Sequence, residues 1–136
     1  MLLAAAALSF LPGYPYIMEN YSDLIPDFAR DANCAVTVCD TDGIILYMND
    51  RAIEIYHRHG NLIGKCLFDC HNERSMSIIR HMLESGEANA YTITKHGQRK
   101  MIYQTPWRRN GMVAGLIEIS MIIADELPHY DRDKGM

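Results

Sequence analysis

The expected fold is determined by one stretch, Cys34-Ala-Val-Thr-Val-Cys-Asp-Thr-Asp-Gly-Ile-Ile-Leu-Tyr-Met48. Its first part, Cys34–Cys39, is rich in the β-branched residues that are typical of strands, and Ile44–Met48 repeats this pattern. Between them lies Asp40-Thr-Asp-Gly43, in which the glycine can adopt the positive φ of a tight turn. The stretch therefore predicts a β-hairpin.

Helical patterns follow the predicted hairpin. Asn49-Asp50 has the residue types of a turn and helix cap, and residues 51–59 predict one or two helical turns. A longer helix is predicted over Ser75–Ser85, which Gly86 would end. Its apolar face is expected to consist of Ile78, Ile79, Met82 and Leu83.

Three further strands are expected after the longer helix. Ala88–Lys95 and Arg99–Thr105 alternate in polarity, and Met112–Ala124 is almost continuously apolar. His96-Gly97 predicts the first turn, and residues 106–111 are expected to form a polar loop. This order predicts an α+β fold, in which a five-stranded antiparallel sheet has short helices and one longer helix covering one face. Such a sheet encloses a concave pocket.

Length and composition agree with one globular domain. The chain has 136 residues, of which 49% are hydrophobic and 22% are charged, and its net charge is −4. The acidic balance argues against a nucleic-acid partner, whose binding domain would be basic. No apolar run approaches the ~20 residues of a transmembrane helix, so no integral membrane span is expected. The four cysteines are weak evidence for disulfides, because so apolar a core does not need them, and a reducing, cytoplasmic compartment is therefore expected.

Four segments are expected along the chain. They are an apolar N-terminal extension (1–17), an amphipathic N-terminal helix (18–31, helical over 21–31), the folded domain (32–124) and a charged tail (125–136). Met1–Phe10 is similar to a short signal-peptide core but has no Lys or Arg before it. Export of this segment is therefore the alternative to a cytoplasmic location.

Three short motifs, taken with the order of the elements, resemble the PAS domain family. They are Asp40-Thr-Asp-Gly43, Asn49 and Leu62-Ile-Gly-Lys65. The resemblance covers about Pro26–Ala124, so residues 32–124 would be the PAS domain. It implies that Asn49 holds the second strand to the following helix.

A narrower resemblance begins at Cys70-His-Asn-Glu-Arg-Ser75. This segment looks like the Cys-His-x-x-x-Ser sequence that opens the long helix in a PAS subfamily of bacterial sensors. Lys100–Pro106, Gly115 and Glu118 also match that group. The resemblance implies a stand-alone sensory domain that binds a small molecule or cofactor between sheet and helix. It would signal as a homodimer or to a partner signalling protein, and it would not be an enzyme. The apolar N-terminus and the helix over residues 21–31 are the expected dimer elements.

The candidate cofactor-binding residues are Cys70, His71, His81, Met82 and Tyr103. One alternative function is a haem-dependent redox or gas sensor, with His71, His81 or Cys70 as the axial ligand. His71 and His81 would be metal ligands only if haem is bound. A zinc site formed by Cys66, Cys70, His71 and His81 lacks the usual Cys-x-x-Cys spacing. The chain has no sequence similar to the Asn-Cys-Arg-Phe-Leu-Gln of light-sensing flavin domains, so flavin is not expected.

A second alternative is a small enzyme on a cone-shaped α+β fold. Such an enzyme needs a pair of reactive side chains in its cavity, for which Tyr103 with His71 is the nearest candidate. The sequence has no nucleophile elbow, P-loop or His-Glu-x-x-His motif, which favours a binding protein.

Overall fold

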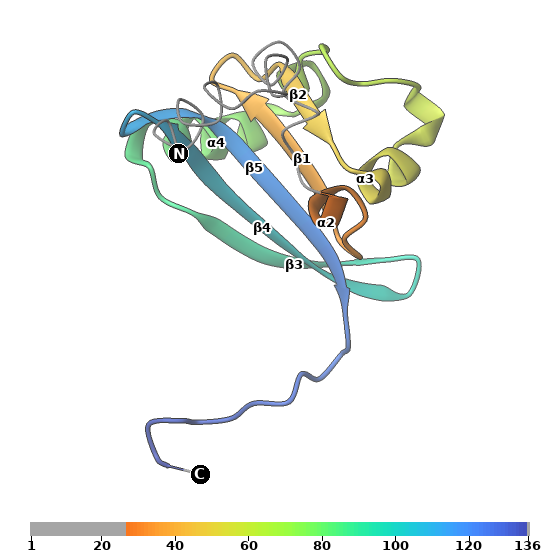
Figure 1. Cartoon of the computed structure of the whole chain (residues 1–136), viewed down its shortest axis with the longest axis vertical. Helices are drawn as coiled ribbons and strands as arrows, with labels where there is room; N and C mark the ends of the chain where they lie inside the picture. Colours follow the sequence, from red (N-terminus) through yellow and green to blue (C-terminus); the bar gives the residue numbers. More distant parts are fainter. Residues whose placement is uncertain (1–26, 136) are drawn as a thin grey trace, which may run out of the picture.

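The computed structural model describes residues 27–135, in which five strands form one antiparallel sheet in the order β2-β1-β5-β4-β3 (Figure 1). The elements in chain order are α2 (Asp27–Arg30), β1 (Ala35–Asp40), β2 (Ile45–Met48), α3 (Asp50–Ile55), the 3-10 turns η2 (His57–His59) and η3 (Leu67–Cys70), α4 (Glu73–Ser85), β3 (Asn89–Lys95), β4 (Gln98–Arg109) and β5 (Met112–Ile123). This architecture confirms the predicted α+β fold and its five strands.

The β1–β2 hairpin forms at the predicted Asp-Thr-Asp-Gly turn. The carboxylate of Asp40 accepts hydrogen bonds from the backbone N–H groups of Asp42 and Ile44, both at 2.9 Å. Gly43 has a φ of 80°, and a Cβ at this position would lie 2.7 Å from the ring of Phe68. The turn therefore requires glycine both for its backbone conformation and for the close approach of the ring.

Asn49 joins three elements through its side-chain amide. The residue is fully buried, with 0% of its surface exposed. Its Oδ1 accepts from the backbone N–H of Val36 at 2.9 Å and of Ala52 at 3.0 Å. Its Nδ2 donates to the carbonyl oxygens of Ala29 at 3.1 Å and Cys34 at 2.8 Å. The amide thus caps α3 directly after β2, which agrees with the role that the PAS resemblance implies, and it also ties α2 and β1 to this turn.

The two predicted helices differ from the structure at their ends. Residues 51–59 do not form one helix, because α3 ends at Ile55 and a separate 3-10 turn follows. The longer helix starts two residues before Ser75, because the side chain of Asn72 accepts a hydrogen bond from the Ser75 N–H and caps the helix. Ile79 and Met82 are buried as predicted, but Ile78 is 40% exposed. The apolar face of α4 is therefore narrower than the sequence pattern indicates.

The predicted loop over residues 106–111 is wrong for its first four residues. β4 continues to Arg109, and Pro106 pairs with Leu116 of β5. Proline has no backbone N–H, so a strand tolerates it only where no neighbouring strand needs that donor. Pairing with β3 ends at Gln104, so β4 is an edge strand at Pro106. The turn itself lies at Asn110-Gly111, where both residues have positive φ.

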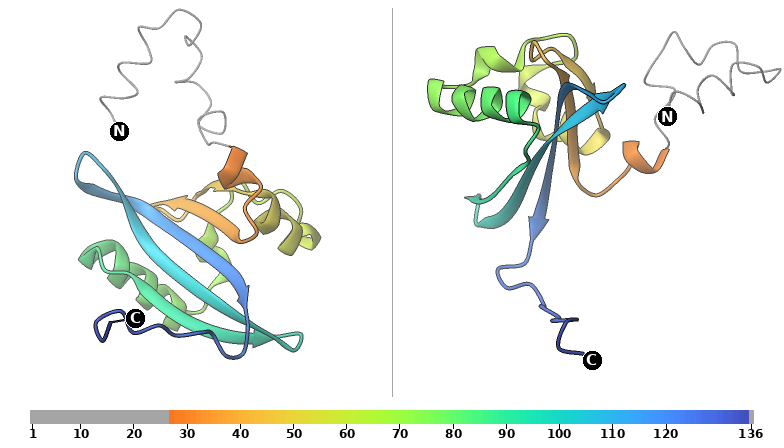
Figure 2. Two further views of the ribbon diagram at one scale, coloured as in Figure 1. Left: turned by 60° about the horizontal axis from the view of Figure 1, so that its bottom comes forward. Right: turned by 90° about the vertical axis from the view of Figure 1, so that its left-hand side faces the viewer.

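The core lies on one face of the sheet and has two clusters. Ala35, Ile45, Met48 and Ala52 pack together near α3, whereas Cys39, Leu116, Ile79 and Met82 pack beneath α4. We call this covered face the inner face and the opposite one the outer face. In the right-hand view of Figure 2, α4 lies on one side of the sheet and α2 on the other.

The ends of the chain relate to the predictions in different ways. Most of the predicted N-terminal helix and the whole segment 1–17 lie outside the described residues, and α2 is the described part of that helix. After β5, the described tail contains no helix or strand and runs away from the sheet (Figure 1). None of the described helices is long and apolar enough to cross a membrane.

We predict that Asn49→Ala lowers the free energy of unfolding by about 3–5 kcal/mol, because it removes four hydrogen bonds and leaves buried backbone groups unpaired. Urea denaturation measures the change. The control is Asn61→Ala, at an exposed residue with a single local bond to Ile63, which should cost less than about 1 kcal/mol. Equal losses in the two variants would contradict the assigned role of Asn49.

Candidate functional site

The strand register aligns the inward side chains in rows that cross the sheet, because side chains alternate between the two faces of a strand. One row is apolar and consists of Cys39, Leu116 and Pro106. The next row takes one residue from each of four strands, namely Thr37, Glu118, Gln104 and Asn89. We call these four residues the polar row. Its position is unusual, because inward positions of a sheet covered by helices are ordinarily apolar.

A directed chain of hydrogen bonds runs along the polar row. The Nδ2 of Asn89 donates to Oε1 of Gln104 at 3.0 Å. The Nε2 of Gln104 then donates to Oε2 of Glu118 at 2.8 Å. The carboxylate of Glu118 is therefore the acceptor at the end of the chain, and its position is fixed by the two amides.

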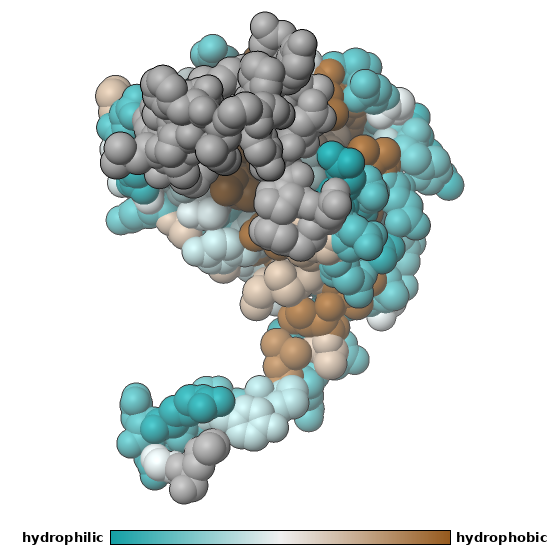
Figure 3. All heavy atoms as spheres, in the orientation of Figure 1, coloured by the Kyte–Doolittle hydropathy of each residue, from teal (hydrophilic) through white to brown (hydrophobic). Residues whose placement is uncertain are grey.

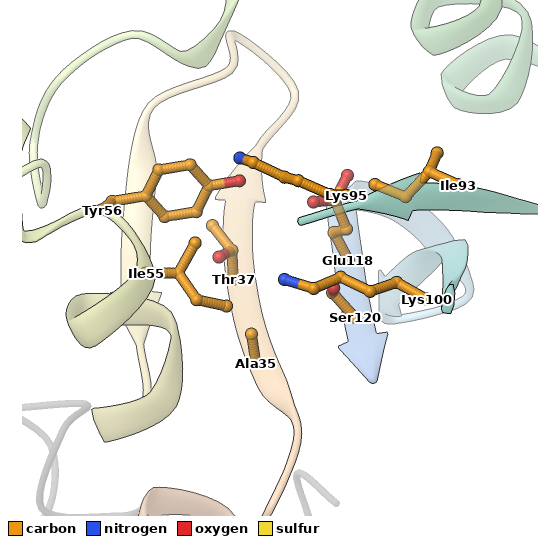
Figure 4. A pocket seen from close by; sticks show the side chains of 9 residues that line it. All are labelled: Ala35, Thr37, Ile55, Tyr56, Ile93, Lys95, Lys100, Glu118 and Ser120. Carbon is orange, nitrogen blue, oxygen red and sulfur yellow. The ribbon is translucent and has the colours of Figure 1, made fainter. Parts of the chain in front are cut away.

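A small cavity lies beside the polar row, between the sheet and the end of α3 (Figure 4). About 60 Å³ of it is open to water-sized atoms. Hydroxyl and charged groups from five elements or their ends meet there with three aliphatic side chains. The lining residues are Ala35, Thr37, Ile55, Tyr56, Ile93, Lys95, Lys100, Glu118 and Ser120.

The charges at the cavity are not paired with one another. The ion pairs found among residues 27–135 do not include Lys95, Lys100 or Glu118. In Figure 4 both lysine side chains extend toward the space between Tyr56 and the sheet, on either side of Glu118. The cavity thus presents two ammonium groups and one carboxylate that are available to another molecule.

Two tyrosines share the environment of this carboxylate. Burial raises the pKa of the Tyr56 hydroxyl, and the negative charge of Glu118 raises it further. The pKa of Tyr91 is raised by the same two causes in the same order. Both hydroxyls therefore remain protonated donors at neutral pH.

The structure brings two of the predicted cofactor residues, His81 and Met82, to one open cavity of about 520 Å³ beside α4, but it places Tyr103 elsewhere. Met82 is buried in the core, and its neighbour His81 is exposed, with Nε2 3.3 Å from Oε2 of Glu87. Tyr103 faces the outer side of the sheet, because its neighbours Ile102 and Gln104 face inward. None of these three predicted residues lines the cavity next to Glu118.

The Cys70-His71 pair lies at the end of η3, before α4. His71 is half-buried, and its Nδ1 is 2.8 Å from the carbonyl oxygen of Leu67. The side chain of Cys70 is outside the described part of the structure. Cys66, four residues earlier, donates from its Sγ to the carbonyl oxygen of Asp42 at 3.5 Å.

A cavity of about 520 Å³ is lined by His81 and Met82, but the cavity beside the polar row is too small for a haem. Cavities for ligands of drug size are about 300–1,000 Å³, several times the volume of the cavity beside the polar row. Neither His71 nor His81 lines this smaller cavity. For the zinc alternative, no group of three or more His, Cys, Asp or Glu residues within the described part of the chain is arranged to hold a metal ion.

Sequence reasoning missed most of the cavity residues. Glu118 had one usable signal, since it is a lone charge within a long apolar strand, Met112–Ile123. A charged residue in an otherwise apolar strand departs from the expected pattern, and such departures often mark functional sites. Thr37, Gln104 and Asn89 had no such signal, because alternating polar residues also occur on solvent-exposed faces. Only the strand register places them in one row with Glu118.

We predict that Tyr56→Phe makes stability less sensitive to alkaline pH. The pKa of Tyr56 is raised in the folded chain, so the folded state holds its proton more tightly than the unfolded state does. The resulting stabilisation is complete below a pH of about 10 and is lost as the pH rises through the folded pKa. Urea denaturation of both proteins across this range should show a shallower alkaline loss in Tyr56→Phe. An unchanged slope would contradict the assigned environment, and Tyr130→Phe, in the exposed tail, is the control.

A family model described as "PAS fold" matches residues 30–126, which is more than half of the chain. No curated protein is significantly similar to it. The PAS domain of the histidine kinase ThkA is 22% identical, with a TM-score of 0.54 over 65% of this chain and 97% of that one.

Two proteins of Vibrio cholerae have the same fold. VqmA, solved as a complex with a ligand and DNA, is 18% identical, with a TM-score of 0.60 over 78% of this chain and 52% of VqmA. The Aer2 receptor, described as a dual PAS-heme oxygen sensor, is 18% identical, with a TM-score of 0.53 over 67% of this chain and 95% of that one. The family match and the β2-β1-β5-β4-β3 sheet confirm the resemblance found in the sequence: the chain belongs to the PAS fold family.

Proposed function

We propose that this PAS domain is a sensor that binds a small molecule in the cavity beside the polar row. The observation that carries the proposal is the position of Glu118, a half-buried carboxylate on the inner face that is held by Gln104 and turned toward the cavity. A charge placed there disfavours packing of the core. Its orientation and the unpaired lysines beside it instead suit the recognition of a ligand.

The relatives support a binding role. VqmA is described in complex with a ligand, and Aer2 is described as an oxygen sensor. PAS domains are generally sensory modules, and we extend a non-enzymatic role to this chain. Its mechanism would be a shift of population, in which the ligand favours one arrangement of the cavity walls over another. The end of α3 is one of those walls, so occupancy of the cavity would be transmitted to this helix.

We predict that a small molecule co-purifies with the chain and is lost from Glu118→Gln, because this change removes the charge while keeping the shape of the side chain. Native mass spectrometry gives the ligand mass, and a visible spectrum reveals any haem. Glu126→Gln, in the exposed tail, is the control and should retain the ligand. Equal occupancy in both variants would contradict the site, and a Soret band lost in His71→Ala would support the haem alternative instead.

We further propose that two copies of the chain associate through the outer face. The register places several apolar side chains there, including Val36, Ile119 and Tyr103, and no cluster of the described core contains them. Apolar surface is also exposed at the end of β5, where the chain leaves the sheet (Figure 3). A second copy would cover this face. We propose a role in the same association for the N-terminal extension (1–17) and the predicted helix (18–31), which precede the PAS domain (32–124) in the sequence, whereas the charged tail (125–136) follows it.

A matched pair of substitutions tests this interface. Tyr103 on the outer face is 39% exposed, and Tyr91 on the inner face is 45% exposed. We expect Tyr103→Lys to weaken self-association about tenfold or more, because it places a charge in an apolar contact, and Tyr91→Lys to leave it unchanged. Sedimentation equilibrium measures both. An unchanged dimerisation constant in Tyr103→Lys would exclude the outer face as the interface.

A further inference from the structure

We propose that the cavity recognises a small zwitterion, namely an α-amino acid or a close analogue of about six non-hydrogen atoms. Its acidic group would lie between Lys95 and Lys100, and its ammonium group would face Glu118. This inference rests on the proposed function, because it names the chemical class of the molecule that the cavity binds. The inference is based on three properties of the cavity: its size, its charges and the free oxygen of Glu118.

The enclosed part of the cavity suits a very small molecule. About 60 Å³ is open to water-sized atoms. By this measure one water needs ~10–15 Å³, so the space holds roughly four to six such atoms. The smallest α-amino acids have this many non-hydrogen atoms. Flat polycyclic cofactors are several times larger.

The charges of the cavity favour a ligand with both signs. Lys95 and Lys100 supply two positive groups and Glu118 one negative group, without ion pairs among themselves. A simple anion would pair with the lysines but would place its charge near the Glu118 carboxylate. A simple cation would pair with Glu118 but would leave both lysines unpaired. Only a zwitterion satisfies both sets of charges, so its competitors are disfavoured by repulsion as well as by missing contacts.

The polar row leaves one oxygen of Glu118 available. Gln104 donates to Oε2, and no hydrogen bond from the described residues to Oε1 is found. An ammonium group has three donors and could bond to this oxygen. The neighbouring hydroxyls of Thr37 and Ser120 could accept its other hydrogens. The aliphatic groups of Ala35 and Ile55 line the same cavity and suit a short apolar side chain.

Isothermal titration calorimetry of the full chain, purified free of any co-purified molecule, tests the proposal with matched probes. Glycine, L-alanine and L-serine are the zwitterions. Propionate is L-alanine without the ammonium group, ethylamine is L-alanine without the carboxylate, and inorganic phosphate tests a general anion site. We expect at least one zwitterion to bind about tenfold or more tightly than propionate, ethylamine and phosphate, since each lost charged hydrogen bond costs about tenfold.

Two variants test the contacts of the ammonium group and of the acidic group separately. Glu118→Gln should weaken zwitterion binding about tenfold, so that the affinity approaches that of propionate. Lys100→Met should weaken zwitterion and propionate alike, while the exposed control Lys65→Met changes neither. Zwitterion binding that is unchanged in Glu118→Gln or Lys100→Met would overturn the inference, as would tighter binding of phosphate or propionate than of any zwitterion.

The outcome also separates this inference from the proposed function. If no zwitterion binds, but native mass spectrometry finds another small molecule that Glu118→Gln releases, the ligand class is wrong and the sensory site remains. If no zwitterion binds and no molecule depends on Glu118, both proposals are wrong.

Discussion

The side-chain amide of Asn49 is the contact on which the arrangement of the other elements depends. Its two donors and two acceptor positions are all used, by α2, by the residue before β1, by β1 itself and by α3. A fully satisfied amide costs little to bury, whereas an incompletely bonded one would be expensive. Asn49 therefore fixes where β1 begins and where α3 leaves β2. The end of α3 in turn supplies the Ile55 and Tyr56 wall of the cavity.

One part of the inner face packs in the core, and the neighbouring part is the proposed binding site. Under α4, Cys39 and Leu116 pack against Ile79 and Met82 and form a dry core. One row further along the strands, the polar row interrupts this packing. The apolar row fixes the sheet and the helix relative to each other, so that Glu118 is held by a rigid scaffold. A charged group on such a scaffold can discriminate between ligands, because it does not move to accommodate the wrong one.

Local patterns predicted the secondary structure well where a single short-range signal decided it. The Asp-Thr-Asp-Gly turn, the cap at Asn49 and the Asn110-Gly111 turn are of this kind, since each depends on neighbours within a few residues. The prediction was wrong at Pro106, because proline ends a strand only where a neighbouring strand needs its N–H. Whether β3 reaches that far is a property of the sheet, and no local pattern contains it.

The sequence by itself determined the order of the elements, because this follows from hydrophobic periodicity and turn residues, and its resemblance to the PAS family implied that Asn49 joins β2 to the helix after it. It could not determine which side chains share a cavity. Of the candidates whose side chains the structure describes, His81 and Met82 line one cavity beside α4, whereas His71 and Tyr103 do not line it. The residues that line the cavity beside the polar row, Thr37, Glu118, Lys95 and Lys100 among them, come from four strands. Only the register of a folded sheet aligns residues that lie so far apart in the chain, and this alignment was decided by the tertiary structure.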